Sequence, residues 1–513
     1  MVLRIGIRFT VLLLTAVLLL SSLVSQAPGT DDIFVQVLAD AVTSLDPAQS
    51  TKTQDWQVTW LLFDALTQLS ADATQMLPAL AERWETSTDG LTSTFHLRKN
   101  VRFHDGTFVD AEAVKASYER RYLPTSPYYT PDKPRPYEKI MSDWVKEIRT
   151  PDPHTVVITT HYARPHQFAQ VSIVSLRALR EQKGDLSRAP IGTGPFRLER
   201  WEGKEIVLQP FSESWHGRPK LAAARFVAQS DDAESVKRLA AGESHLGLNI
   251  PSDFYEQLRA NPRVKLLPYG GLNTMFLGMQ LDRPLLKDRR VREAIVRAVD
   301  RERIATVLGR GAMIASRSIL PPNCPGFDSA ISQPAYDPDR ARALLRDAGM
   351  ASGLRLRLLY HNPLEVWSEI VYAVQADLEK VGIGVELLRA PSWTAYHVER
   401  KKNAHHLYLY SWGVSAPDPE RFLYPLFYSQ SENNFGGLTS KRIDQLLTEA
   451  RQPMEASRRL RVFSQANGFV VEEIPALFLV HRINMAGVST KLKGLELNLE
   501  GLPQDKLATV EIR

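Results

Sequence analysis

Short apolar stretches that suit β-strands alternate with amphipathic, helix-like stretches along most of the 513 residues. Residues 354–360 have the pattern of a strand, residues 366–380 that of a helix, and residues 383–388 that of the next strand. A strand–helix–strand unit of these lengths predicts a parallel pair of strands. The alternation as a whole predicts an α/β protein.

Several of the predicted helices have an aspartate at their start. Asp110, Asp288, Asp300 and Asp337 each precede an apolar pattern with helical spacing. An aspartate in this place accepts a hydrogen bond from a free N–H group of the first turn. We therefore predict that all four residues are helix N-caps.

The N-terminal segment has the pattern of an export signal. Two arginines precede an apolar run over residues 9–20, and small residues follow it up to Ala27. The run is shorter than the roughly 20 residues that a membrane-spanning helix needs. Residues 1–27 are therefore expected to be a signal peptide. Pro28 is unfavourable directly after a cleavage site, so an uncleaved N-terminal anchor is the alternative.

Length, charge and cysteine content narrow the class of protein. A chain of 513 residues exceeds the ~250–300 residues of a single core, so two or three lobes are expected. The net charge of +5 is mild and its arginines are mixed with acids, which argues against a nucleic-acid partner. Cys324 is the single cysteine, so neither a disulfide nor a lipid-modified N-terminal cysteine is expected. These features predict a soluble protein that is free in the periplasm.

The sequence contains no pattern that predicts catalysis. It has no GxSxG, HExxH or GxxxxGK[ST] motif, and Pro195 after Gly192-Thr193-Gly194 lacks the N–H that a phosphate loop needs. His405-His406 is the best metal candidate, but neighbours on a strand point to opposite faces. We therefore expect no enzyme activity, no metal and no cofactor.

Collinear motifs along the chain resemble extracellular solute-binding protein family 5, the dipeptide-, oligopeptide- and nickel-binding group. The most specific block is FHLRKNVRFHDGT at residues 95–107, which is followed by Tyr118-Glu119-Arg120. Further blocks are Ser44-Leu45-Asp46-Pro47, Leu80-Ala81-Glu82-Arg83-Trp84, Gly192-Thr193-Gly194-Pro195-Phe196, Trp215-His216-Gly217-Arg218-Pro219-Lys220, Tyr336-Asp337-Pro338, Ser411-Trp412-Gly413 and Asp418-Pro419. The resemblance covers nearly all of the chain after the signal.

The resemblance implies a periplasmic-binding-protein-like, two-lobe hinge fold (a Venus flytrap) with an extra inserted subdomain. Lobe I would combine residues 31–67, 191–268 and 484–513, with residues 68–190 as its inserted subdomain, and lobe II would span residues 269–483. The chain would cross between the lobes twice, near residues 268–271 and 482–487.

The resemblance also implies the function of a substrate-binding component of a bacterial ABC importer. Such a protein captures a peptide or a similar small polar solute between its lobes and delivers it to the membrane permease, and it is expected to be a monomer. Two alternatives remain open. One is a periplasmic sensor or adaptor that presents its solute to a receptor, and the other is an importer component for an opine, a sugar or a metal chelate.

Candidate ligand-binding residues follow from collinearity with the family. They are Thr51, Lys52, Thr53, Tyr128, Met275, Phe276, Arg400, Ser411, Trp412, Gly413 and Ser415. In the peptide-binding relatives an aspartate three residues after the tryptophan holds the α-ammonium group, and here Ser415 stands in that place. A serine cannot neutralise an ammonium, which favours a blocked peptide or another polar solute. Lys52 and Arg400, if both face the cleft, predict an anionic ligand.

Overall fold

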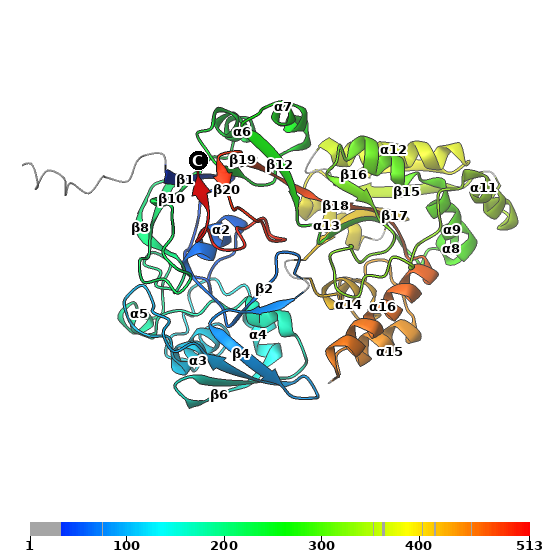
Figure 1. Cartoon of the computed structure of the whole chain (residues 1–513). Coiled ribbons are helices and arrows are strands. Elements are labelled where there is room, and N and C mark those ends of the chain that lie inside the picture. Colours follow the sequence, from blue (N-terminus) through cyan, green and yellow to red (C-terminus); the bar gives the residue numbers. More distant parts are fainter. Residues whose placement is uncertain are drawn as a thin grey trace, which may run out of the picture.

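The computed structural model describes residues 32–513 apart from residues 74, 352, 362–364, 403, 415–416 and 453. Three sheets, each with helices packed against it, dominate these residues (Figure 1). We call them the seven-stranded, four-stranded and six-stranded units. The predicted signal peptide, residues 1–27, lies outside the described residues, and no helix within them is long and apolar enough to cross a membrane.

The seven-stranded unit is built from three separate parts of the chain. Its strand order is β12-β19-β11-β1-β10-β9-β8, and β1 runs parallel to both of its neighbours. The strands are β1 (Ile33–Leu38), β8 (Phe196–Glu202), β9 (Glu205–Pro210), β10 (Ala223–Ala228), β11 (Leu246–Gly247), β12 (Val264–Tyr269) and β19 (Asn484–Ser489). Its helices are α2 (Thr53–Leu62), α6 (Asp232–Ala241) and α7 (Tyr255–Arg259), with the 3-10 turn η4 (Ser252–Phe254). The short pair β20 (Leu492–Lys493) and β21 (Glu511–Ile512) follows β19.

The four-stranded unit is an antiparallel sheet of order β4-β5-β7-β6. Its strands are β4 (Ala81–Thr86), β5 (Thr92–Leu97), β6 (Val145–Asp152) and β7 (Thr155–Thr160). The helices α3 (Ala111–Glu119), α4 (Glu138–Trp144) and α5 (Leu176–Glu181), the 3-10 turn η3 (Pro165–Ala169) and the hairpin β2 (Thr67–Leu69) and β3 (Met76–Pro78) surround it. Phe95, Tyr118 and Trp144 are fully buried in its core.

The six-stranded unit has the order β14-β18-β13-β17-β15-β16. Its strands are β13 (Asn273–Met279), β14 (Met313–Ala315), β15 (Arg355–Tyr360), β16 (Gly384–Arg389), β17 (Leu407–Gly413) and β18 (Ala476–Arg482). Its helices are α8 (Pro284–Lys287), α9 (Arg289–Ala298), α10 (Arg301–Arg303), the π turn η5 (Ile304–Leu308), α11 (Pro338–Asp347), α12 (Glu365–Lys380), α13 (Trp393–Lys401), α14 (Glu420–Phe427), α15 (Lys441–Glu449) and α16 (Ala456–Glu473). β15, α12 and β16 form the predicted unit, and the two strands pair in parallel.

The predicted caps and the predicted fold class are confirmed. Asp110 accepts a hydrogen bond from the Ala113 N–H at 2.8 Å. Asp288, Asp300 and Asp337 accept from N–H groups of their own first turns at 2.9–3.0 Å. The described residues form a mixed α/β protein, as the alternating pattern predicts.

The chain passes between the seven-stranded and six-stranded units at two places. β12 leads into β13 through Gly270 and Gly271, and β18 leads into β19 through Ile483. Both glycines have a positive φ, 76° and 99°, which side-chain-bearing residues rarely adopt. Figure 1 shows the six-stranded unit on one side of these crossings and the other two units on the opposite side. The exact domain boundaries remain a prediction.

Candidate functional site

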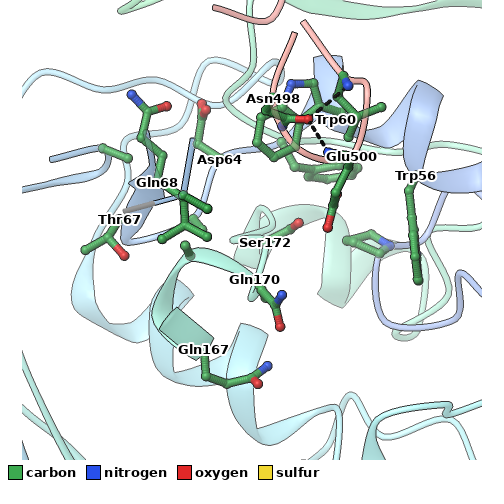
Figure 2. Close-up of a pocket in the computed structure, with 18 of the residues that line it drawn as sticks. Trp56, Trp60, Asp64, Thr67, Gln68, Gln167, Gln170, Ser172, Asn498 and Glu500 are labelled. Atoms are coloured by element: carbon green, nitrogen blue, oxygen red, sulfur yellow. Dashed lines mark hydrogen bonds between the residues drawn. The ribbon is translucent and has the colours of Figure 1, made fainter. Parts of the chain in front are cut away.

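A large cavity opens where the three units meet (Figure 2). Its empty space is about 1320 Å³ including solvent at its mouth, which is ample for a small solute. The wall combines α2 and the loop after it, the hairpin β2–β3, parts of the four-stranded unit and the C-terminal loop before β21. From the six-stranded unit the cavity is lined only by Leu272 and Pro417 among the described residues.

Aromatic rings of α2 form one face of the cavity. Trp56 and Trp60 are four residues apart and so lie on the same side of the helix. The indole N–H of Trp60 donates to the Pro503 carbonyl at 2.7 Å, which fixes the ring. Trp56 lies 6.3 Å from the ring of Tyr137, centroid to centroid. These flat faces can pack on apolar or cationic parts of a solute.

Asp64, just after α2, is held in a buried network at the cavity wall. It accepts hydrogen bonds from Thr193 Oγ1 at 2.8 Å and Trp215 Nε1 at 3.0 Å. His216 Nε2 lies 3.0 Å and Lys506 Nζ 3.4 Å from its other oxygen. Burial alone would raise the pKa of Asp64, but the charges of His216 and Lys506 outweigh burial and hold the pKa well below its usual value. Both carboxylate oxygens of Asp64 therefore have partners within the protein, so Asp64 stabilises the cavity wall and is not available to a solute.

Neutral polar side chains line the opposite face. Gln68, Gln170 and Ser172 contact the cavity, and their side chains make no hydrogen bond to another described residue. Asn498 Oδ1 accepts from the backbone N–H groups of Glu500 and Leu502, each at 2.9 Å (Figure 2). The three unpartnered groups are available to a polar solute.

Arg121 adds a positive charge to the cavity wall. Its side chain is only 5% exposed, and the guanidinium makes no hydrogen bond or ion pair with the described part of the chain. Burial and the charge of Arg120 lower the pKa of Arg121 to about 10. Arg120, by contrast, binds Asp46 bidentately at 2.9 and 2.5 Å and also the Gly184 carbonyl. Of these two neighbouring arginines only Arg120 has a protein partner.

Glu500 adds a negative charge on the C-terminal loop. Figure 2 shows its side chain pointing into the cavity, toward the side of Gln170 and Ser172. Its carboxylate has no partner among the residues described, although it remains open to solvent in the cavity. The protein atoms around the carboxylate remove part of its hydration and raise the pKa of Glu500 to about 7, against the opposing charge of Arg421.

Four of the candidates, Thr51, Lys52, Thr53 and Tyr128, are not among the residues that line this cavity. Thr51, Lys52 and Thr53 are at the start of α2, where Lys52 Nζ pairs with Asp40 at 2.6 Å. Tyr128 packs against the core of the seven-stranded unit, with its hydroxyl 3.4 Å from Arg180 Nε.

The candidates between residues 275 and 413 lie on and beside the central strands of the six-stranded unit. Met275 and Phe276 are buried on β13. The Arg400 guanidinium lies 3.3 Å from the centroid of the Phe435 ring. On β17, Ser411 donates to Asn273 at 2.8 Å, Gly413 is opposite Asn273, and Trp412 Nε1 donates to the Arg421 carbonyl at 2.8 Å.

None of these ten candidates is among the described residues that line the cavity, and Ser415 lies outside the described residues. Their contact with a ligand remains a prediction. The sequence reasoning missed Trp56, Trp60, Arg121 and Glu500. The only local sequence feature that marked Arg121 was its position next to Arg120, directly after a family motif. No local sequence feature marked Glu500.

Comparison with known proteins identifies the family. The profile of "Bacterial extracellular solute-binding proteins, family 5 Middle" matches residues 75–434. The chain belongs to this family. The resemblance expected from the motifs is thus confirmed, and the protein is a solute-binding protein of a transport family.

Similar proteins cover nearly the whole chain. The dipeptide-binding protein of Escherichia coli (strain K12) is 26% identical over 466 residues, covering 84% of this chain and 86% of that protein. Heme-binding protein A of Haemophilus influenzae is 26% identical over 497 residues, covering 91% and 90%. The structure of HbpA2 from Haemophilus parasuis has a TM-score of 0.86 at 25% identity, over 94% of this chain and all of that one. The two-lobe fold of this family is therefore the fold of this chain.

Proposed function

We propose that the protein is the substrate-binding component of an ABC importer, which captures a peptide or a similar small polar solute in the large cavity and delivers it to a membrane permease. The cavity supports this proposal most strongly, because it joins aromatic faces, unpartnered polar groups and unpaired charges where the three units meet. The names of similar proteins include dipeptide-binding and di/tripeptide-binding proteins.

The proposal includes the arrangement of the chain. Residues 31–67, 191–268 and 484–513 form lobe I, residues 68–190 its insertion and residues 269–483 lobe II, which closes over the cavity about the crossings at Gly270-Gly271 and Ile483. The protein acts without catalysis, as an exported monomer in the periplasm. Trp412 is the sequence-predicted residue best placed to approach the solute on closure, because it binds Arg421 and Arg421 in turn donates to Gln167 of the cavity wall at 3.2 Å.

The test combines ligand identification with a change in the cavity wall. Native mass spectrometry of freshly purified protein identifies a co-purified solute, and calorimetry measures binding of a dipeptide panel. Trp56→Ala should weaken binding at least about tenfold, since ~1.4 kcal/mol of lost ring contact has this effect. Trp201→Ala, which removes a tryptophan from β8 outside the cavity, is the matched control. Unchanged affinity in Trp56→Ala would show that the solute binds elsewhere.

A further inference from the structure

We propose that Arg121 and Glu500 hold the two opposite charges of a zwitterionic solute, with Arg121 binding its carboxylate and Glu500 binding its ammonium or another cationic group. This assignment rests on the proposed function and specifies the chemistry of the same cavity.

Arg121 has the properties of an anion-binding group. It is more than nine-tenths buried, it lines the cavity, and its Nε atom is buried without a hydrogen-bond partner. Its neighbour Arg120 has Asp46, while no carboxylate pairs with Arg121 in the described residues. A guanidinium offers two parallel N–H groups that match a carboxylate, so a carboxylate entering the cavity supplies the missing partner.

Glu500 has the complementary properties. Asn498 holds the loop through the Glu500 backbone N–H, which leaves the carboxylate directed into the cavity. The ring of Trp56 lines the same space and can attract a cation through its face, whereas Lys506 Nζ already lies 3.9 Å from the centroid of the Trp60 ring. The loss of hydration raises the pKa of Glu500, so a cation placed beside the carboxylate would favour its ionised form.

The two charges share one cavity. Arg121, Glu500 and Tyr137 all line it, and Trp56, whose ring centroid lies 6.3 Å from that of Tyr137, lines it with them. One small solute can therefore contact both charges.

This assignment replaces the charge pattern that the sequence suggests. Lys52 is paired with Asp40, and Arg400 lies over Phe435, so neither offers its charge to the cavity. The peptide-binding relatives are expected to carry an aspartate at the position of Ser415. In this chain Glu500, from the C-terminal loop, provides a carboxylate instead. A free-amino peptide is then an acceptable ligand in spite of the serine.

The experiment measures the binding of alanyl-phenylalanine in its free, N-acetylated and C-amidated forms by calorimetry at pH 7.5, where the peptide ammonium is still largely protonated. Wild-type protein should lose at least tenfold in affinity with either modification. Arg121→Met should bind the free and amidated forms equally, and Glu500→Gln the free and acetylated forms equally. Arg149→Met and Glu496→Gln, which change exposed residues on β6 of the four-stranded unit and on the C-terminal loop, should behave as wild type. Equal wild-type affinity for all three forms overturns the charge assignment and leaves solute capture intact.

A second arm does not depend on peptides. At equal ionic strength, sodium acetate should raise the melting temperature of wild type but not of Arg121→Met. Ethylammonium chloride should raise that of wild type but not of Glu500→Gln. If wild type binds none of the three peptide forms, peptide capture is contradicted, and these two shifts decide the charge assignment alone. If the two shifts in melting temperature are absent, the charge assignment is overturned. It is also overturned if ligand-free Arg121→Met melts below wild type, because a buried charge without a partner should not stabilise the fold.

Discussion

At the scale of single residues, the cavity shows how neighbours of the same type acquire different roles. Arg120 and Arg121 follow α3 directly, yet Arg120 is neutralised by Asp46 and the next side chain is not. Asp64 and Glu500 differ in the same way, since Asp64 has Lys506 and His216 beside it and Glu500 has no partner in the described residues. The charges of Arg120 and Asp64 are paired within the protein, while those of Arg121 and Glu500 are available to a solute.

The pKa of Glu500 predicts a pH dependence of solute affinity. Its value of about 7 means that the carboxyl is protonated below neutral pH, and only the ionised form attracts a cation. Affinity for free alanyl-phenylalanine should therefore rise with pH, up to about tenfold per unit below pH 7, and level off above it. Calorimetry between pH 5.5 and 7.5 measures this slope, a range in which the peptide ammonium stays largely protonated.

Other titrations are controlled by the variant Glu500→Gln. The groups that act on Glu500 and its neighbour Tyr137 are Arg421 and Arg121, which stay charged in this range, and Tyr137 itself, whose pKa is raised. The slope should thus be absent from Glu500→Gln. The same slope in both proteins would assign the effect to another group.

At the scale of elements, the loop that carries Gly192-Thr193-Gly194 explains why glycines flank a threonine there. The loop runs against the end of α2, and the Gly194 N–H donates to the Leu62 carbonyl at 3.0 Å. A Cβ on Gly192 would lie 2.0 Å from the Leu62 oxygen, and one on Gly194 2.2 Å from the Leu61 oxygen. The close approach lets Thr193 reach Asp64, so this turn positions the cavity wall instead of binding phosphate.

A pair of glycine-to-alanine variants tests this packing. Gly194→Ala should lower the stability by about 1–3 kcal/mol, because the backbone of α2 cannot yield to the added methyl group. Gly468→Ala in α16 is the matched control, since its nearest neighbour beyond the helix backbone would be 3.7 Å away. This variant should be stabilised by ~0.5–1 kcal/mol through the loss of glycine's freedom in the unfolded chain. Urea unfolding that gives the two variants the same sign would contradict the role assigned to the loop.

Elements were predictable from the sequence to the extent that their causes are local. The strand–helix–strand pattern of β15, α12 and β16 and the four aspartate caps depend on neighbouring residues, and all are present. The cavity depends on distant ones, because Trp60 meets the loop of Pro503 and Lys506 from the far end of the chain. Collinearity predicts Met275 as a ligand contact; its side chain is buried on β13, between β17 and β18, and the contact stays a prediction. Whether a charge is paired is a property of the fold, so Arg121 could not be distinguished from Arg120 in the sequence.

At the scale of the whole molecule, a buried charge cluster joins the four-stranded and six-stranded units across the cavity. Arg164, before η3, binds Glu420 at the start of α14 at 3.0 Å and lies 3.8 Å from Asp418. Burial would lower the pKa of Arg164, but Glu420 and Asp418 outweigh burial and raise it. Gln167 and Arg421 add a hydrogen bond between the same two elements. These contacts lie far from the two chain crossings in sequence. They can therefore hold the four-stranded and six-stranded units together at a place where no chain segment connects them.

Replacing Arg164 should therefore change the balance between open and closed forms more than it changes folding. In Arg164→Met, Glu420 keeps Arg459 at 2.6 Å and Arg451 at 3.4 Å, and Asp418 keeps Arg459 at 3.4 Å, so neither carboxylate loses all its partners. We expect a larger radius of gyration in small-angle X-ray scattering without solute, and a dissociation rate of bound peptide that is several times faster. Arg458→Met is the control, because Arg458 pairs with Glu449 inside the six-stranded unit. If Arg164→Met has the wild-type radius of gyration and dissociation rate, this prediction is contradicted. The closed form would then be stabilised by the solute and the two crossings alone, and the charge cluster would form on closure without stabilising it.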